Sequence, residues 1–136
     1  MNLLKYMSGT IGEASLTVTK NLVAPVLKTG LVNVLSTAIL AALMEEASCQ
    51  ALKKINSKCS VGVSINLQHR KPSAIGANVK ALSKIVTIND KSITFDIECF
   101  DETGLVGTAT HRRVYVDKDI FEQKCYQNFE KAKRTN

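Results

Sequence analysis

Residues 38–54 read AILAALMEEASCQALKK, and this segment predicts the long helix around which the rest of the chain is arranged. It contains neither glycine nor proline and is rich in alanine, leucine and methionine, which favour the helical backbone. Ser36 and Thr37 precede it and can cap its first turn. At about 1.5 Å per residue the segment forms a helix about 25 Å long, roughly the width of a small sheet. Because its apolar residues lie nearly all round, we expect other elements to pack around it.

Segments with strand character lie on both sides of this helix. Residues 13–23 precede it, and their β-prone composition predicts a first strand. Four more strands are predicted after the helix, at residues 60–69, 77–88, 92–100 and 105–116. Turn-forming residues separate the last three of these strands, as expected for hairpins.

The order of these elements predicts an α+β domain in which one long helix lies against a curled sheet. A hotdog fold agrees best with it: a long central helix wrapped by a curled antiparallel sheet of about five strands. A cystatin-like fold is the alternative, but that fold usually has a longer or an additional N-terminal helix. The C-terminal residues 117–133 add a short amphipathic helix with four apolar positions, Ile120, Phe121, Cys125 and Phe129.

Length and composition limit the classes of function. The 136 residues, 45% of them hydrophobic, suit one domain spanning residues 1–136. The four cysteines form no CxxC pair and no histidine stands at zinc-finger spacing, so we expect no metal and a cytoplasmic protein with reduced thiols. Residues 31–44 are too short and too interrupted by polar residues to span a bilayer, and residues 1–7 lack the apolar stretch of a signal peptide.

The net charge of +6 favours an anionic partner such as a phosphorylated small molecule. Nucleic acid is the least favoured of these partners, because the basic residues are dispersed and aromatic residues make up only 5% of the chain. A membrane partner is not expected either.

His69 stands where an aliphatic side chain was expected. In residues 61–69, VGVSINLQH, aliphatic and polar residues alternate, and the histidine falls on the apolar face at the end of the predicted strand. A titratable ring at the rim of a core face suits general acid–base chemistry. For a histidine considered alone, a ring bonded to the backbone at the edge of the core is the more frequent arrangement. Whether His69 is a catalytic or a structural residue therefore depends on the other residues near it.

Glu45 is a second titratable group in an unexpected place. It shares its side of the helix with small residues such as Ala41, whereas Glu46 faces the polar side. Burial there would raise its pKa unless a donor or a cation stands by. Thr37 lies two turns earlier on a similar side. Each of these residues alone could be a surface glutamate or a plain helix cap, but together with His69 they indicate a cleft.

The last predicted strand supplies a third group. Residues 107–113, GTATHRR, are rich in small residues and end in three potential cations. Arg113 shares its face of the strand with His111, whereas Arg112 points to the opposite face. An arginine at a strand end most often packs along the sheet into solvent. It can also hold a carboxylate or a phosphate.

In their order and spacing, these stretches resemble the fluoroacetyl-CoA thioesterase-like family of hotdog proteins. The resemblance covers residues 36–116, and it rests on Ser36-Thr37, Leu43-Met44-Glu45, Val61-Gly62-Val63, His69, Pro72, Gly76 and residues 107–113. It implies a homodimer with two active sites at the subunit interface, and two such dimers could form a tetramer.

The same resemblance implies the roles of single residues. Thr37, Glu45 and His69 correspond to the catalytic group of the family, Gly62 to a glycine beside the thioester, and Arg113 to the arginine of its Thr-His-x-Arg stretch. We expect the Gly62 backbone to approach the thioester because no Cβ intervenes. Arg70, together with the other basic residues, would suit the phosphates of CoA.

The expected function is hydrolysis of an acyl-CoA thioester to the free acid and CoA, with no cofactor besides the CoA of the substrate. Members specific for fluoroacetyl-CoA carry aromatic residues before the helix, and residues 26–35 contain none. A general activity on short or small acyl groups is therefore expected. The alternative is a non-catalytic hotdog module that binds acyl-CoA or a nucleotide as a sensor, but such a module has no need of all three catalytic groups.

Overall fold

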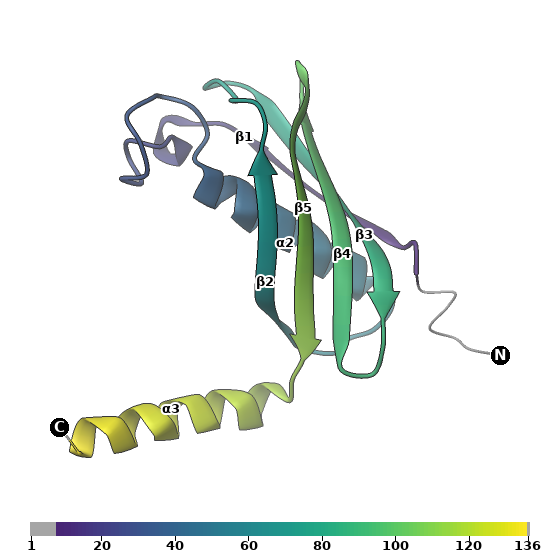
Figure 1. The fold of residues 1–136 in the computed structure, drawn as a ribbon, viewed down its shortest axis with the longest axis vertical. Coiled ribbons are helices and arrows are strands. Elements are labelled where there is room, and N and C mark those ends of the chain that lie inside the picture. The colour runs from purple at the N-terminus through teal and green to yellow at the C-terminus, as the bar shows by residue number, and fades with distance from the viewer. Residues whose placement is uncertain (1–7, 136) are drawn as a thin grey trace.

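The computed structural model describes residues 8–135, so the expectation for residues 1–7 lies outside the described residues. Five strands form one antiparallel sheet in the order β1-β3-β4-β5-β2, and the long helix α2 lies across one face of it (Figure 1). The elements in chain order are β1 (Ile11–Thr17), the 3-10 helix η1 (Lys20–Leu22), α2 (Thr37–Lys53), β2 (Ser60–His69), β3 (Asn78–Ile88), β4 (Ser92–Asp101), β5 (Gly104–Tyr115) and α3 (Lys118–Arg134). This is the predicted α+β architecture.

The predicted elements agree with the observed ones to within a residue or so, except for the first strand. It was expected over residues 13–23, but β1 ends at Thr17. The chain then leaves the sheet and closes a tight turn in which the Leu22 amide donates to the Thr19 carbonyl at 3.1 Å. The predicted cap is confirmed, because the Ser36 side chain accepts from the Ala38 amide at the start of α2.

The hydrophobic core lies between α2 and the sheet. Its largest fully buried side chains come from both layers and include Leu40, Met44, Ile85, Phe95 and Ile97. The helix approaches β1 so closely that no side chain fits at Gly12: a Cβ there would lie 2.2 Å from the Ala47 carbonyl oxygen. This glycine therefore sets the distance between helix and sheet.

Strand β2 forms one edge of the sheet, and α2 leaves much of it uncovered. Val63 is 49% exposed and Ile65 is 36% exposed, although both were expected on the core face. Among residues 8–135, no strand pairs with the outer edge of β2.

The strict alternation expected along β2 is wrong, because a β-bulge lies between Gly62 and Ser64. Gly62 pairs with Arg113 and Ile65 pairs with His111, two residues of β5 that share a face. Residues directly opposite each other in a sheet lie on the same side. The extra residue thus moves Gly62 to the face of His69, opposite to the face that alternation predicts.

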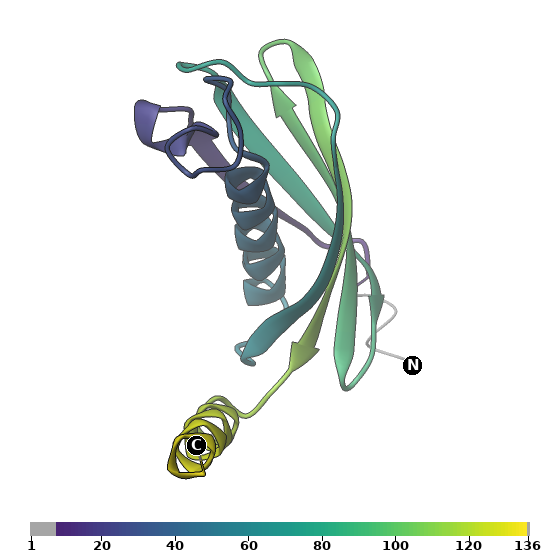
Figure 2. The same cartoon turned by 60° about the vertical axis from the view of Figure 1, so that its left-hand side comes forward.

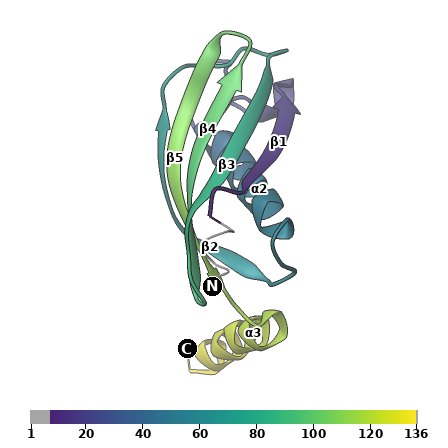
Figure 3. The same cartoon turned by 90° about the vertical axis from the view of Figure 1, so that its right-hand side faces the viewer.

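The C-terminal helix α3 extends away from the sheet and from α2 (Figures 2 and 3). The Asp117 side chain caps it by accepting from the Ile120 amide at 3.0 Å. The apolar residues of the predicted amphipathic helix lie on α3 but are not buried. Ile120, Phe121 and Phe129 are about half-exposed, at 52%, 49% and 57%. Within residues 8–135, no helix has the length and apolar character needed to cross a membrane.

Candidate active site

The first residue of α2 meets the last residue of β2. The Thr37 Oγ1 atom lies 2.8 Å from the His69 Nδ1 atom, a hydrogen bond between two side chains that are 32 residues apart in sequence. His69 pairs with Gly107 across the sheet, so no side chain opposes it on β5. The structure thus brings together two of the three residues that were predicted as catalytic.

The other nitrogen of the His69 ring, Nε2, is buried and has no hydrogen-bond partner among residues 8–135. Burial lowers the pKa of His69 below its ordinary value of 6.5, because desolvation penalises the charged imidazolium. At neutral pH the ring is therefore mostly uncharged, and Nε2 is left buried without a hydrogen-bond partner among the described residues. A neutral imidazole with an unoccupied nitrogen is the form that accepts a proton in general base catalysis.

A cavity of about 340 Å³ opens at this pair of side chains. Arg70 and Lys71 follow His69 at its rim, and both are exposed. The Arg70 Nε atom donates to Thr108 Oγ1 at 3.2 Å, and the Lys71 Nζ atom donates to the Thr103 carbonyl at 2.9 Å. Both residues line the cavity, but the Arg70 guanidinium is held toward Thr108 on the outer face of the sheet and the Lys71 ammonium toward the turn between β4 and β5.

Glu45 does not contact His69; its carboxylate lies over Gly62 instead. The Oε1 atom accepts from Arg113 Nη1 at 3.2 Å and lies 3.8 Å from His111 Nε2. The Glu45 side chain is 46% exposed, whereas Arg113 is buried. The deep burial considered for this carboxylate is therefore not observed, and a cation stands beside it.

Gly62 leaves room for the Glu45 carboxylate. A Cβ on residue 62 would lie 2.5 Å from Glu45 Oε1, 3.2 Å from His111 Cε1 and 3.3 Å from Arg113 Nη1. Any other residue would have to displace the carboxylate. Glu45, Arg113 and His111 converge on one glycine, and the β-bulge turns that glycine toward them.

The predicted site residues thus form two groups within one chain. One is the Thr37–His69 pair, which we call the histidine pair. The other consists of Glu45, Gly62 and Arg113, which we call the glutamate cluster. Gly62 and His69 are seven positions apart along β2, but because of the bulge they span only six positions of β5, from Arg113 to Gly107, a distance of about 20 Å at 3.3 Å per residue. A reaction that uses both groups in one subunit would have to bridge that separation.

His111 contacts the glutamate cluster, although sequence analysis identified it only as one of three potential cations at a strand end. It is 1% exposed, and its ring stacks on Phe95 with 5.8 Å between ring centroids. Burial lowers the pKa of His111, and the neighbouring Arg113 lowers it further, while the contacts with Ser64 and Glu45 act in the opposite direction. The one signal in the sequence was that His111 shares its strand face with Arg113.

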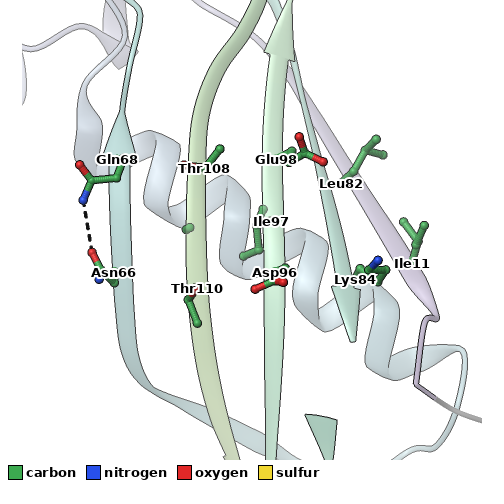
Figure 4. A pocket seen from close by; sticks show the side chains of 11 residues that line it. Ile11, Asn66, Gln68, Leu82, Lys84, Asp96, Ile97, Glu98, Thr108 and Thr110 are labelled. Carbon is green, nitrogen blue, oxygen red and sulfur yellow. Dashed lines mark hydrogen bonds between the residues drawn. The ribbon is translucent and has the colours of Figure 1, made fainter. Parts of the chain in front are cut away.

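A larger hollow, of about 570 Å³, lies on the sheet face opposite α2. Figure 4 shows its lining side chains in front of the sheet with α2 behind. Most of them are polar or charged, among them Asn66, Gln68, Lys84, Asp96, Glu98, Thr108 and Thr110. None of the predicted site residues lines it, so the candidate active site is on the helix side of the sheet.

The sequence itself places the chain in a family. The sequence model described as FlK, fluoroacetyl-CoA-specific thioesterase, matches residues 18–119, from the end of β1 to the start of α3. The chain belongs to this family. The matched residues include every member of the histidine pair and of the glutamate cluster. None of the curated protein sequences is significantly similar to the chain.

Solved structures share the fold. The Thermus thermophilus hypothetical protein TTHA0967, a thioesterase superfamily member, superposes with a TM-score of 0.85 at 16% identity over 95% of this chain and 96% of its own. The fluoroacetyl-CoA thioesterase FlK gives a TM-score of 0.82 at 19% identity over 88% of this chain and 95% of its own. A hot-dog-like protein from Thermanaerovibrio acidaminovorans gives 0.79 at 22% identity over 90% and 92%. The predicted hotdog fold is confirmed.

Proposed function

We propose that this protein is an acyl-CoA thioesterase that hydrolyses short or small acyl-CoA thioesters to the free acid and CoA. Membership of the FlK family supports thioester hydrolysis in general, without fixing the acyl group. The observation that carries the proposal is the histidine pair: His69 is held by Thr37 at Nδ1, and its buried Nε2 is unpartnered beside a cavity. Arg70 and Lys71, which line the cavity, suit the phosphates of CoA. We also propose that the enzyme is cytoplasmic.

The proposed active unit is a homodimer that joins two copies through β2. The outer edge of β2 offers unpaired backbone groups and the exposed apolar side chains of Val63 and Ile65. Antiparallel pairing of two copies about a two-fold axis at Asn66 would set His69 opposite the partner's Gly62, because the bulge takes up one residue and each of the two then lies three paired positions from that axis. The separation of about 20 Å within one chain would then become a contact between two chains.

Each proposed site therefore combines the histidine pair of one subunit with the glutamate cluster of the other. Both groups face the helix side of the sheet, since the β-bulge turns Gly62 to the face of His69. This arrangement gives a structural reason for the bulge. Without it, Gly62 would lie on the outer face, away from the partner's His69.

In the proposed reaction, water attacks the thioester carbonyl carbon while His69 Nε2 accepts its proton. The C–S bond then breaks, the sulfur of CoA takes the proton from His69, and the free acid leaves. Thr37 orients the ring through Nδ1. The partner's Glu45 faces the imidazolium that forms transiently and stabilises its charge. The Gly62 backbone allows the thioester to approach, because no Cβ intervenes.

A second route uses the Glu45 carboxylate as the nucleophile. It would form a mixed anhydride with the acyl group and release CoA, and water would then hydrolyse the anhydride. Incorporation of ¹⁸O into Glu45 after a single turnover in ¹⁸O-labelled water identifies this second route. Direct attack by water leaves Glu45 unlabelled, whereas attack by the carboxylate followed by hydrolysis at the glutamyl carbon leaves ¹⁸O in its side chain.

The test of the function is hydrolysis across a panel of acyl-CoA thioesters of increasing chain length. Cys125 is a free, exposed cysteine that a thiol reagent can reach, so the assay uses Cys125→Ser or follows the loss of thioester absorbance. We expect turnover of the short members and a loss of about 10²–10⁴-fold in His69→Ala. Thr110→Val is the matched control, because Thr110 is exposed on the opposite sheet face. Thermal stabilisation by acyl-CoA without any turnover would instead support the non-catalytic binding module.

A further inference from the structure

We propose that His111 is a positioning residue of the active site: it holds the Arg113 guanidinium against Glu45 and fixes the β-bulge that presents Gly62 to both. The expected effect of His111 on kcat rests on the proposed thioesterase function. Its expected effect on the positions of Arg113 and Glu45 does not, so the two expectations can fail separately.

The ring of His111 is fixed on all sides. It is 1% exposed, and it stacks on Phe95 at an interplanar angle of 26°. Its Nδ1 atom lies 2.8 Å from the carbonyl oxygen of Ser64, the residue that follows the bulge. A carbonyl oxygen only accepts hydrogen bonds, so Nδ1 carries the proton and donates. His111 therefore ties β5 to the end of the bulge through a side-chain contact.

The assignment of Nδ1 as donor determines the role of the other nitrogen. In the neutral ring Nε2 carries a lone pair and accepts, and Arg113 Nη1 lies 3.3 Å from it. A doubly protonated ring would instead direct an N–H at the guanidinium, which has no acceptor. The two contacts thus select one neutral tautomer of His111.

The Arg113 guanidinium uses its donors in three directions. Nε donates to Ser60 Oγ at 2.9 Å, and Nη2 donates to the Ser60 carbonyl at 3.2 Å. Nη1 has two protons, and its two neighbours are Glu45 Oε1 at 3.2 Å and His111 Nε2 at 3.3 Å. Without the acceptor on His111, one buried N–H of Arg113 has no partner, which favours a shift of the guanidinium away from this position.

A displaced Arg113 guanidinium would change the position of Glu45, which it contacts directly. Glu45 is half-exposed and is held over Gly62 by Arg113, so a displaced guanidinium lets the carboxylate swing into solvent. The Cε1 edge of His111 also borders Gly62, 3.2 Å from the position of a Cβ there. His111 thus acts on the site through Arg113 and through the backbone of β2, and in this scheme it does not touch the thioester.

Two substitutions separate the two contacts of the ring. In His111→Gln the amide reaches the position of Nε2 and can accept from Arg113. In His111→Asn the shorter amide reaches the position of Nδ1 and can donate to Ser64, but it leaves Arg113 without its acceptor. Thr110→Val, on the exposed opposite face of β5, is the control for a general effect on the strand.

We expect His111→Asn, which loses the contact with Arg113, to lose about tenfold or more in kcat, and His111→Gln, which loses only the contact with Ser64, to lose less. KM should change little in either variant. A purely structural role predicts the reverse: a fall in Tm for both variants with kcat unchanged in the folded protein. Equal kcat in folded His111→Gln and His111→Asn overturns the proposal.

A second readout does not depend on turnover. The ¹³C NMR resonance of the Glu45 carboxyl at neutral pH should move from its wild-type position in His111→Asn and stay near it in His111→Gln, because a loosely held Arg113 no longer contacts the carboxylate. The same carboxyl resonance in both variants overturns the positioning role even if the protein proves to be no thioesterase. A shift confined to His111→Asn supports it even then.

Discussion

Gly62→Ala is the substitution that best separates the site from the fold. The new Cβ would lie 2.5 Å from Glu45 Oε1, a distance that two non-bonded atoms cannot keep. The other close atoms, on His111 and Arg113, are at 3.2 and 3.3 Å and can give by a few tenths of an ångström. The Glu45 side chain is 46% exposed and free to swing outward, so it is the group that moves.

The stability of the fold should change little in this variant. An ion pair with one half-exposed partner contributes on the order of 0–1 kcal/mol. Replacing a strand glycine with alanine recovers about 0.5–1 kcal/mol of backbone entropy. The two terms are of similar size and opposite sign, so the free energy of unfolding by urea should stay within about 1 kcal/mol of the wild type. The hydrolysis rate should fall by about 10²-fold, since a shift of about 1 Å at a reacting group has that effect.

The matched control is the same substitution in a Glu45→Ala background. If the clash with the carboxylate causes the loss, Gly62→Ala has no further effect once that carboxylate is gone. Equal fold-losses in the two backgrounds would refute the reasoning, because the glycine would then act independently of Glu45. Wild-type activity in Gly62→Ala alone would refute it too.

Three further predictions concern the fold, the interface and the pH dependence. Gly12→Ala should lower the free energy of unfolding by about 3 kcal/mol, since its Cβ would meet the backbone of α2 at 2.2 Å, and an unchanged urea midpoint would contradict this. Ile65→Lys should yield monomers in analytical ultracentrifugation and abolish turnover, whereas Ile11→Lys, at the other sheet edge, should keep the dimer; an intact dimer in both rejects β2 as the interface. Because desolvation lowers the pKa of His69, its neutral, proton-accepting form persists below pH 6.5, so kcat/KM should stay level above that pH and fall only below it. An acid limb with its midpoint above pH 7 would exclude His69 as the base.

Most of the fold could be predicted from the sequence because its signals are local. A segment without glycine or proline forms α2, and the alternation along residues 92–100 forms β4 with its burial as expected. The first strand was predicted too long, because the residues after Thr17 have a strand-like composition but form the turn that contains η1. The C-terminal helix was also predicted from its amphipathic pattern, but nothing in that pattern indicated that α3 would extend away from the sheet.

The site could be predicted only in part. Thr37 and His69 lie at the ends of consecutive elements, so the order of elements brings them together. The place of Glu45 could not be predicted, because it depends on the bulge in β2 and on the register with β5 that puts Arg113 opposite Gly62. A bulge is one extra residue in a pairing between two strands, and no pattern within one strand encodes it.

Each active site is proposed to be shared between two subunits, and this sharing can be measured by mixing two inactive variants. His69→Ala and Glu45→Ala are purified, unfolded together and refolded as a mixture. If the site is shared, a mixed dimer has one site with both substitutions and one site with neither, so random pairing restores about a quarter of the wild-type activity. If all catalytic groups act within one chain, every site in the mixture carries one substitution. A mixture no more active than the separate variants, with mixed dimers present, would contradict the account.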